Sequence, residues 1–308
     1  MRETIPGSSF PVRRDGAMGV EAAGPGTAPA DLDSTMLDTV VIEPRSAWQL
    51  VDWRALWRYR ELLMILAYRD ISVRYKQTVL GAAWAVLQPL LQLVAFWVFF
   101  GRMGGLAGKV EGDYSLFLLA GLLPWQLFFT GVGQAAQSVV SNSNLISKVY
   151  FPRLVVPIAA LGSALVDFLV AAVVSVPWLM IRGLGWHSSQ CLVPVFFLGI
   201  VLATVAVGVG LSALVAEFRD FRYVTGFLLQ IWMFFSPVAY PLSIVPGGWQ
   251  LVYAINPLVG LIEGFRSALL GQPFAWGPIG VSVVSLVCLL VVGLVCFRRV
   301  EQRLADIV

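Results

Sequence analysis

The sequence predicts an all-α integral membrane protein with six transmembrane helices, an N-terminal amphipathic interfacial helix, and re-entrant helices on the outward side between spans five and six. Three observations predict this class. Only 13% of the 308 residues are charged and 58% are hydrophobic, whereas about 25% of a soluble domain is charged. The mean hydropathy is +0.80. Residues 78–100 contain no charge, and a helix of that length crosses a hydrocarbon core of about 30 Å.

Two segments precede the first span. Residues 1–44 are rich in Gly, Pro, Ala and Asp and contain no apolar run of a signal peptide, so we expect a disordered cytoplasmic tail. Residues 45–77 are expected to form the amphipathic interfacial helix, because two apolar stripes alternate with charged ridges around its axis. Two stripes indicate a helix that contacts lipid on one side and protein on the other. A plain lipid-anchoring helix is the alternative.

The transmembrane domain is expected over residues 78–300, followed by a cytoplasmic C-terminus at 301–308. The predicted spans are 78–100, 114–134, 154–181, 191–216, 223–240 and 277–297. Gln88 and Pro89 predict a buried amide and a kink inside span one. Asp167 is the clearest acid within a span, and it is open to two interpretations: a proton relay, or pairing with a neighbouring amide, hydroxyl or arginine.

The uncharged stretch at residues 223–262 is long enough for two crossings. Two crossings would place the basic residues Arg298, Arg299 and Arg303 outside, against the positive-inside rule. Prolines and glycines also interrupt this stretch repeatedly. We therefore expect one crossing followed by a re-entrant segment at 241–273, because non-helical backbone at membrane depth is tolerated only against protein or a water-filled cavity.

No catalytic or metal chemistry is predicted for this chain. The phosphate-binding motif GxxxxGK[ST] is missing, since GGLAGKV at 104–110 has a misplaced glycine and a valine after its lysine. His187 is the only histidine, and the three cysteines lie in apolar runs without the spacing of a metal site. We therefore expect no catalytic residue, no cofactor and no metal ion in the chain itself.

Aromatic residues are abundant in spans one, two and five. Interfacial and lipid-facing belts account for some of them. The alternative is a channel whose rings stack on the apolar faces of sugars. The candidate channel aromatics are Trp84, Phe96, Trp97, Phe100, Trp125, Phe128, Phe129, Phe227, Trp232, Phe235 and Tyr240.

Four stretches, in this order, carry a family resemblance. They are RDISVRYKQTVLGAAWAVLQPL (69–90), LISKVYFPRLVVPIAALGSALVDF (145–168), FRDFRYVTGFLLQIWMFFSPVAYP (218–241) and AINPLVGLIEGFRSALLG (254–271). Together they resemble the transmembrane, or permease, subunit of bacterial ATP-binding-cassette exporters of cell-surface polysaccharides. These are the O-antigen and teichoic-acid exporters of the type-2 superfamily. The resemblance covers about residues 53–300 and leaves the long N-terminal tail without a counterpart.

The resemblance implies a bacterial inner-membrane protein with both termini cytoplasmic. Two copies would form the channel beside two separate ATP-binding-cassette subunits, which would bind ATP and Mg²⁺, so the chain is not expected to be an enzyme by itself. Residues 137–153 correspond to the segment that couples to the ATPase, and residues 241–273 to outward-side gate helices. The implied coupling residues are Asn144, Lys148, Tyr150, Phe151, Pro152 and Arg153. The implied gate residues are Pro246, Gly247, Gly248, Trp249, Tyr253, Pro257 and Glu263.

A cluster of basic residues lies just before the first span. Cations at this level attract lipid diphosphates, although the positive-inside bias alone would also place them there. The candidates for the headgroup and diphosphate side are Arg54, Arg58, Arg69, Arg74 and Lys76.

The function implied by the resemblance is ATP-driven export of a lipid-linked polysaccharide, O-antigen or a similar polymer, on an undecaprenyl-diphosphate-type carrier. The expected partners are a second copy, the two ATPase subunits, the lipid-linked polymer and membrane lipids, with no nucleic acid. A drug or lipid exporter of the same superfamily is the alternative. A membrane glycosyltransferase is disfavoured, because it would need clustered acids or a histidine near a membrane face.

Overall fold

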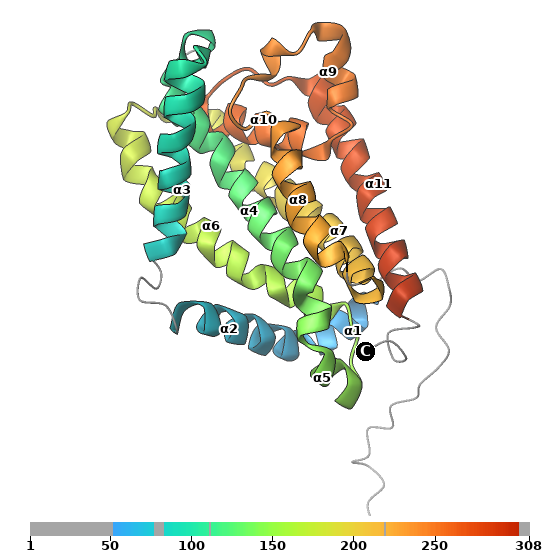
Figure 1. The fold of residues 1–308 in the computed structure, drawn as a ribbon. Coiled ribbons are helices and arrows are strands. Elements are labelled where there is room, and N and C mark those ends of the chain that lie inside the picture. Colours follow the sequence, from blue (N-terminus) through green and yellow to red (C-terminus); the bar gives the residue numbers. More distant parts are fainter. Residues whose placement is uncertain (1–51, 77–82, 111, 219, 302–308) are drawn as a thin grey trace, which may run out of the picture. The chain divides into compact units, whose positions relative to one another are not determined.

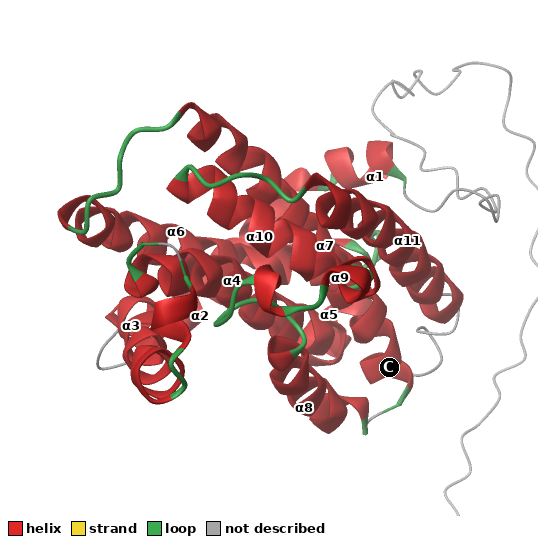
Figure 2. Ribbon diagram, turned by 90° about the horizontal axis from the view of Figure 1, so that it is seen from above, coloured by secondary structure: helices red, strands yellow, loops and turns green. Residues whose placement is uncertain are grey.

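The computed structural model describes residues 52–76, 83–110, 112–218 and 220–301 (Figure 1). The chain divides into two units, residues 1–45 and 46–308, and every described residue belongs to the second. Within the described residues the regular elements are all helical and no strand is present (Figure 2). The tail predicted at 1–44 lies outside the described residues.

Five helical segments are long and apolar enough to cross a membrane. They are Val86–Met103, Tyr114–Ser141, Val155–Ile181, Ser188–Glu217 and Trp276–Glu301. They include most of α3 (Ala83–Phe96) and all of α4 (Tyr114–Ser141), α6 (Val155–Ile181), α7 (Val193–Glu217) and α11 (Trp276–Glu301). The prediction of an all-α membrane protein with several spans is confirmed at this level. After α3 the chain continues as a π-helix over Trp97–Met103.

Helix α4 is longer than predicted. Span two was expected to end near residue 134, but α4 continues to Ser141. No glycine, proline or charge interrupts residues 135–141, so nothing in the sequence stops the helix there. Asn142 alone separates α4 from the short helix α5 (Ser143–Lys148). The predicted coupling segment at 137–153 therefore begins inside the last turns of α4.

Helix α8 (Phe221–Phe234) is shorter than the predicted fifth span. Its 14 residues rise about 21 Å, which is too short for it to count among the five candidate spans. It ends because Pro237 disfavours helical backbone at the residue before it. The crossing predicted over 223–240 is thus part helix and part turn.

Two helices, α1 (Trp53–Arg58) and α2 (Arg60–Lys76), occupy the described part of the predicted interfacial helix. Asp52 starts α1 by accepting a hydrogen bond from the Ala55 N–H at 2.9 Å. The chain breaks at Tyr59, so the stretch is two helices rather than one.

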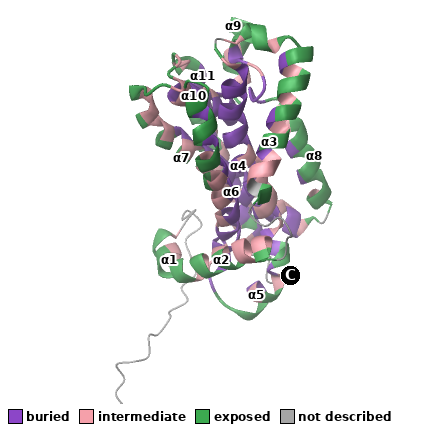
Figure 3. Cartoon of the chain, turned by 90° about the vertical axis from the view of Figure 1, so that its left-hand side faces the viewer, coloured by how far each residue is buried: buried purple, intermediate pink, exposed green. Residues whose placement is uncertain are grey.

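Helix α2 packs directly against α6. A Cβ built on Gly162 would lie 2.8 Å from the Cβ of Ala67, so the glycine permits close approach of the two helices. Leu66 is buried in this contact, whereas Tyr68 of the same helix is exposed. Figure 3 shows half-buried and exposed parts along α2. The helix therefore has one face on protein and one face free of this chain.

Helices α9 (Gly247–Tyr253) and α10 (Pro257–Leu270) lie between α8 and α11. Asn256 starts α10 by accepting a hydrogen bond from the Leu258 N–H at 3.1 Å, and a proline follows it at the first helical position, where no N–H is needed. Gly271 ends α10 with φ +72°, a left-handed conformation that glycine adopts without strain. Most of α10 is buried against its neighbours.

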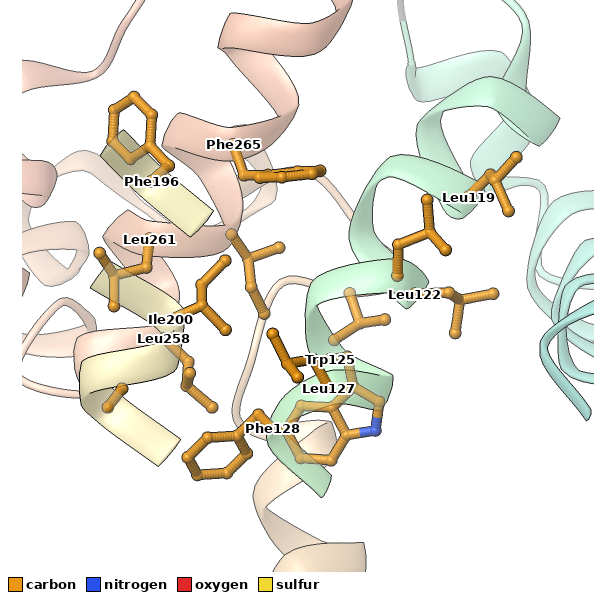
Figure 4. Close-up of a cluster of buried hydrophobic side chains, with 14 of the residues drawn as sticks. Leu119, Leu122, Trp125, Leu127, Phe128, Phe196, Ile200, Leu258, Leu261 and Phe265 are labelled. Carbon is orange, nitrogen blue, oxygen red and sulfur yellow. The ribbon is translucent and has the colours of Figure 1, made fainter. Parts of the chain in front are cut away.

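Two apolar clusters hold the helices together. The larger one joins α4, α7 and α10 around Trp125, Phe128, Ile200 and Leu258 (Figure 4). The second joins α2, α5, the start of α6, and the ends of α4, α7 and α11. We call the end of the bundle that carries this second cluster the inner end, and the opposite end, which carries α9 and α10, the outer end (Figure 1).

Candidate functional site

A polar cleft opens at the inner end between α2, α3, α4 and α6. Its volume is about 760 Å³, within the range of small-molecule sites. Most of its lining side chains carry hydrogen-bonding groups, and Phe129 provides an aromatic ring. The polar lining residues are Arg69, Asp70, Arg74, Gln88, Thr130, Gln134, Gln137, Ser138, Ser141, Asn142 and Ser163.

One face of α4 supplies much of this lining. Thr130, Gln134, Gln137 and Ser141 are three or four residues apart, so they lie on one side of the helix. Gln126 extends the same stripe deeper and donates to Thr130 Oγ1 at 3.2 Å. Sequence analysis did not single out this stripe, although its helical spacing would have shown it.

Arg74 and Tyr75 of α2 both bind the carboxylate of Asp167 in α6. Arg74 Nη2 lies 2.8 Å from Asp167 Oδ2, and the Tyr75 hydroxyl donates to Asp167 Oδ1. Burial, and then the hydrogen bond to Asp167, raise the pKa of Tyr75 to about 12, so the phenol stays protonated and donates at neutral pH. Of the two interpretations of Asp167, the structure shows pairing with an arginine and a hydroxyl. This pairing fixes the end of α2 against the third span.

Arg69 has two partners, the partly exposed Asp70 and the buried Asn142. Its Nε and Nη2 atoms donate to Asp70 Oδ1 at 3.0 and 2.8 Å, and Nη2 also donates to Asn142 Oδ1 at 2.7 Å. The Arg69 side chain is 45% exposed. The two guanidinium groups of the cleft are thus balanced by the carboxylates of Asp70 and Asp167, and the cleft is mixed rather than simply cationic.

The remaining predicted headgroup cations lie outside the cleft. Arg54, Arg58 and Lys76 are exposed on α1 and α2. Arg60, also exposed, lies over the Trp57 ring at 5.4 Å. Only Arg69 and Arg74 of the predicted basic set are therefore brought together at one cavity.

The predicted channel aromatics do not form one surface. Trp125 and Phe128 are 1% and 0% exposed in the larger apolar cluster; they are core residues, and their faces are covered by this chain. Trp84, Trp97, Phe227 and Phe235 are exposed. The partly buried members are Phe96, Phe100, Phe129, Trp232 and Tyr240.

The predicted gate residues lie at the outer end. Pro246, Gly247, Gly248 and Trp249 are exposed around the start of α9, and Pro257 is buried at the start of α10. Tyr240 and Tyr253 share a hydroxyl–hydroxyl hydrogen bond, and Glu263 is partly buried on α10.

A fully buried cation, which the site prediction missed, lies beside these residues. Arg266 of α10 is 0% exposed, and its Nη1 lies 2.7 Å from Glu263 Oε2. Its Nη2 donates to the carbonyl oxygens of Pro237 and Val238 at 2.7 and 3.1 Å, and its guanidinium lies 3.7 Å from the centre of the Phe117 ring. We call these five residues the Arg266 cluster. An arginine three residues after Glu263 in an otherwise apolar helix was a signal that could have found it.

The predicted coupling residues surround α5. Asn144, Lys148 and Tyr150 are exposed, whereas Phe151 is buried and Pro152 is partly buried. Arg153 Nη1 donates to the Glu301 carbonyl oxygen at the end of α11 at 2.6 Å. The α5 side of this stretch therefore exposes polar groups, while its last residue, Arg153, is bonded to the end of α11.

Residues 61–270 match the sequence model of a family described as ABC-2 type transporter. The chain belongs to this family. It is 30% identical over 259 residues to the O-antigen export system permease protein RfbA of Myxococcus xanthus, covering 81% of this chain and 96% of that protein. An RfbA of Klebsiella pneumoniae is 27% identical over 252 residues, covering 80% and 95%. The polysialic acid transport protein KpsM of Escherichia coli is 26% identical over 251 residues, covering 78% and 93%.

These comparisons confirm the resemblance on which the sequence analysis relied. As a family member with five candidate spans, the chain is a multi-pass inner-membrane permease subunit. Members of the ABC-2 permease family work with ATP-binding subunits, and the permease subunit is not itself the ATPase.

Proposed function

We propose that this chain is the membrane-spanning subunit of an ATP-driven exporter that moves a lipid-linked polysaccharide, O-antigen or a similar polymer, across the inner membrane. The observation that carries this proposal is the inner-end cleft, in which two arginines and a dense lining of amides and hydroxyls meet where α2 joins the spans. Hydroxyls of a glycan and oxygens of a diphosphate satisfy such groups. An apolar drug would leave them unpaired, at a cost in binding free energy.

The proposed carrier is an undecaprenyl-diphosphate-type lipid. Arg69 and Arg74 line the cleft, and Arg54, Arg58 and Lys76 are exposed nearby on the same pair of helices. Basic residues at the headgroup level attract anionic headgroups. The relatives that are named for O-antigen export support a glycan as the cargo.

The proposed topology has six crossings with both ends cytoplasmic. Helix α8 and the turns after it would make the fifth crossing, and α9 and α10 would form the re-entrant gate on the outward side. The inner end carries α2 and the last turn of α11, where Arg298 and Arg299 lie. Placing this basic end in the cytoplasm satisfies the positive-inside rule.

The proposed assembly contains two copies of this chain and two ATPase subunits. Helix α8 buries only Thr225 and Leu229 in this chain and exposes Phe227 and Phe234, with Phe235 exposed just after it. This suits a face that a second copy covers. Trp84 and Trp97 of span one are exposed as well, and rings of this kind are the proposed surface for the moving glycan. The ATPase subunit, which would itself bind ATP and Mg²⁺, would contact the exposed side of α5.

The test is ATPase stimulation in the purified complex of this chain with its ATPase subunit, reconstituted into nanodiscs. We expect a polyprenyl-diphosphate-linked glycan to stimulate hydrolysis several-fold and a panel of apolar drugs to have no effect. Stimulation by the drugs together with indifference to the glycan lipid would instead establish the drug-exporter alternative.

A further inference from the structure

We propose that Arg69 and Asn142 form a relay that reports occupancy of the cleft to the coupling segment. The inference rests on the proposed function, because it takes a lipid diphosphate as the ligand. In the structure Arg69 is bonded to Asn142. A bound diphosphate would accept the hydrogen bonds of the Arg69 guanidinium, so the Arg69–Asn142 bond would break. Without this bond, α5 would change its orientation.

Asn142 occupies the only position between α4 and α5. Its backbone N–H donates to the Ser138 carbonyl at 3.1 Å, and its own carbonyl accepts hydrogen bonds from the N–H groups of Leu145 and Ile146, both at 3.0 Å. The same residue thus ends one helix and starts the next. A change in its side-chain bonding therefore acts at the joint that sets the direction of α5.

Both polar atoms of the Asn142 side chain are hydrogen-bonded, and the residue is largely buried. Its Nδ2 donates to the Ser138 carbonyl at 2.8 Å, and its Oδ1 accepts the bond from Arg69 at 2.7 Å. The residue is only 9% exposed. A buried acceptor that loses its donor is costly to leave unpaired, so removal of Arg69 favours a rearrangement around Asn142.

Arg69 is the arginine of the cleft that a ligand is able to bind by displacing its present partners. It is 45% exposed and is paired with the adjacent Asp70, and an exposed pair of this kind is weak. A diphosphate presents several anionic oxygens to the planar guanidinium and makes stronger, bidentate hydrogen bonds. Arg74 is unsuited to this role, because it is bonded to Asp167, whose second oxygen is held by Tyr75.

The geometry makes opposite predictions for two variants of Asn142. Asn142→Ser shortens the side chain and removes the acceptor of Arg69. The joint between α4 and α5 should then adopt, without ligand, the conformation that the ligand induces in the wild type. Asn142→Asp adds charge, which strengthens the bond from Arg69, while it loses the Nδ2 hydrogen bond to the Ser138 carbonyl. A residue that only capped a helix or only bound the ligand would not produce effects of opposite sign.

The experiment uses the full chain with its ATPase subunit in nanodiscs, with undecaprenyl diphosphate as the probe and uncharged undecaprenol as its control. We expect Asn142→Ser and Arg69→Gln to raise probe-independent ATPase activity toward the stimulated wild-type level, so that stimulation falls to about one-fold. We expect Asn142→Asp to require several-fold more probe for half-maximal stimulation. Arg102→Gln, the same change at an exposed arginine near the outer end, serves as the matched control and should behave as wild type.

Hydrogen exchange provides a second readout that does not depend on turnover. In the wild type, the probe should increase exchange at the amides of residues 143–148, and in Arg69→Gln this exchange should be high already without probe. Wild-type stimulation and exchange in both Asn142 variants would overturn the relay. Low basal activity with lost probe binding in Asn142→Ser would also overturn it, because Asn142 would then be a binding residue only. A wild type that does not respond to the probe would refute the proposed carrier itself, and the relay with it.

Discussion

The inner-end cleft has two arginines and the Arg266 cluster has one, all beside acidic or carbonyl oxygens, but water reaches them to very different extents. Arg69 is 45% exposed and Arg74 is 37% exposed, whereas Arg266 is 0% exposed. An exposed pair exchanges partners at little cost, and a buried one is costly to break. The comparison indicates that the inner end is suited to recognition and the outer end to holding irregular backbone in place.

The largest expected effect is on removal of the buried cation. Arg266→Met leaves Glu263 and the carbonyls of Pro237 and Val238 without their donor, so we expect a loss of about 3–5 kcal/mol in stability. Thermal unfolding of the detergent-solubilised protein measures it. Glu263→Gln keeps an acceptor but leaves the buried Arg266 guanidinium without its counter-charge, so this change should be costly as well. A loss below about 1 kcal/mol in Arg266→Met would remove the contrast between the two ends.

The next effect tests how closely the Arg266 cluster is packed. A Cβ on Gly121 of α4 would lie 2.5 Å from Arg266 Nη2 and 2.7 Å from the Val238 oxygen, so Gly121→Ala should destabilise the protein by about 1–3 kcal/mol. Gly133 of the same helix has open space around its Cβ position. Gly133→Ala, near the cleft, should be neutral or stabilising by up to about 1 kcal/mol. Equal effects at both positions in unfolding measurements would contradict the packing described here.

A smaller effect is expected at the pair that fixes α2 to α6. Asp167→Asn removes the charge that faces Arg74 but keeps an acceptor for the Tyr75 hydroxyl, so we expect a loss of about 1 kcal/mol, discounted for the solvent that reaches Arg74. A double-mutant cycle with Arg74→Gln isolates the coupling of the two side chains. Strictly additive losses would show that the pair does not hold α2.

The smallest effect is a pH dependence at the outer surface. Burial would raise the pKa of Asp113, but hydrogen bonds from Ser115 and the Arg182 guanidinium outweigh it and hold that pKa below its usual value. A depressed pKa stabilises the fold above the unfolded pKa of about 3.9, and this contribution is lost as the pH falls through the folded pKa. Asp113→Asn should therefore flatten the acid limb of the stability–pH curve below about pH 4. An unchanged acid limb would show that this surface pair contributes nothing.

The class of fold was predictable because it depends on local composition. Long uncharged stretches at residues 78–100 and 277–297 predict spans whatever they pack against. The short length of α8 was harder to predict, because the run of apolar residues continues past Pro237 and conceals the end of the helix. The proline itself was the usable signal.

The candidate site was less predictable because it depends on which faces meet. Trp125 and Phe128 resemble the exposed rings of span five in sequence, and only packing shows that α7 and α10 cover them. The contact between Arg69 and Asn142 joins residues 73 positions apart, and no spacing rule predicts it. Helical spacing did contain the polar stripe of α4, which runs from Gln126 to Ser141.

The π-helix at Trp97–Met103 has a consequence for every argument from helical wheels in span one. Its hydrogen bonds skip one more residue than those of an α-helix, so each side chain advances by a smaller angle around the axis. Trp97 and Phe99 consequently do not lie where the periodicity of α3 would put them. Deleting one residue before Arg102, which lies in this π-helix, would restore regular winding and leave Arg102 on nearly the same side of the axis.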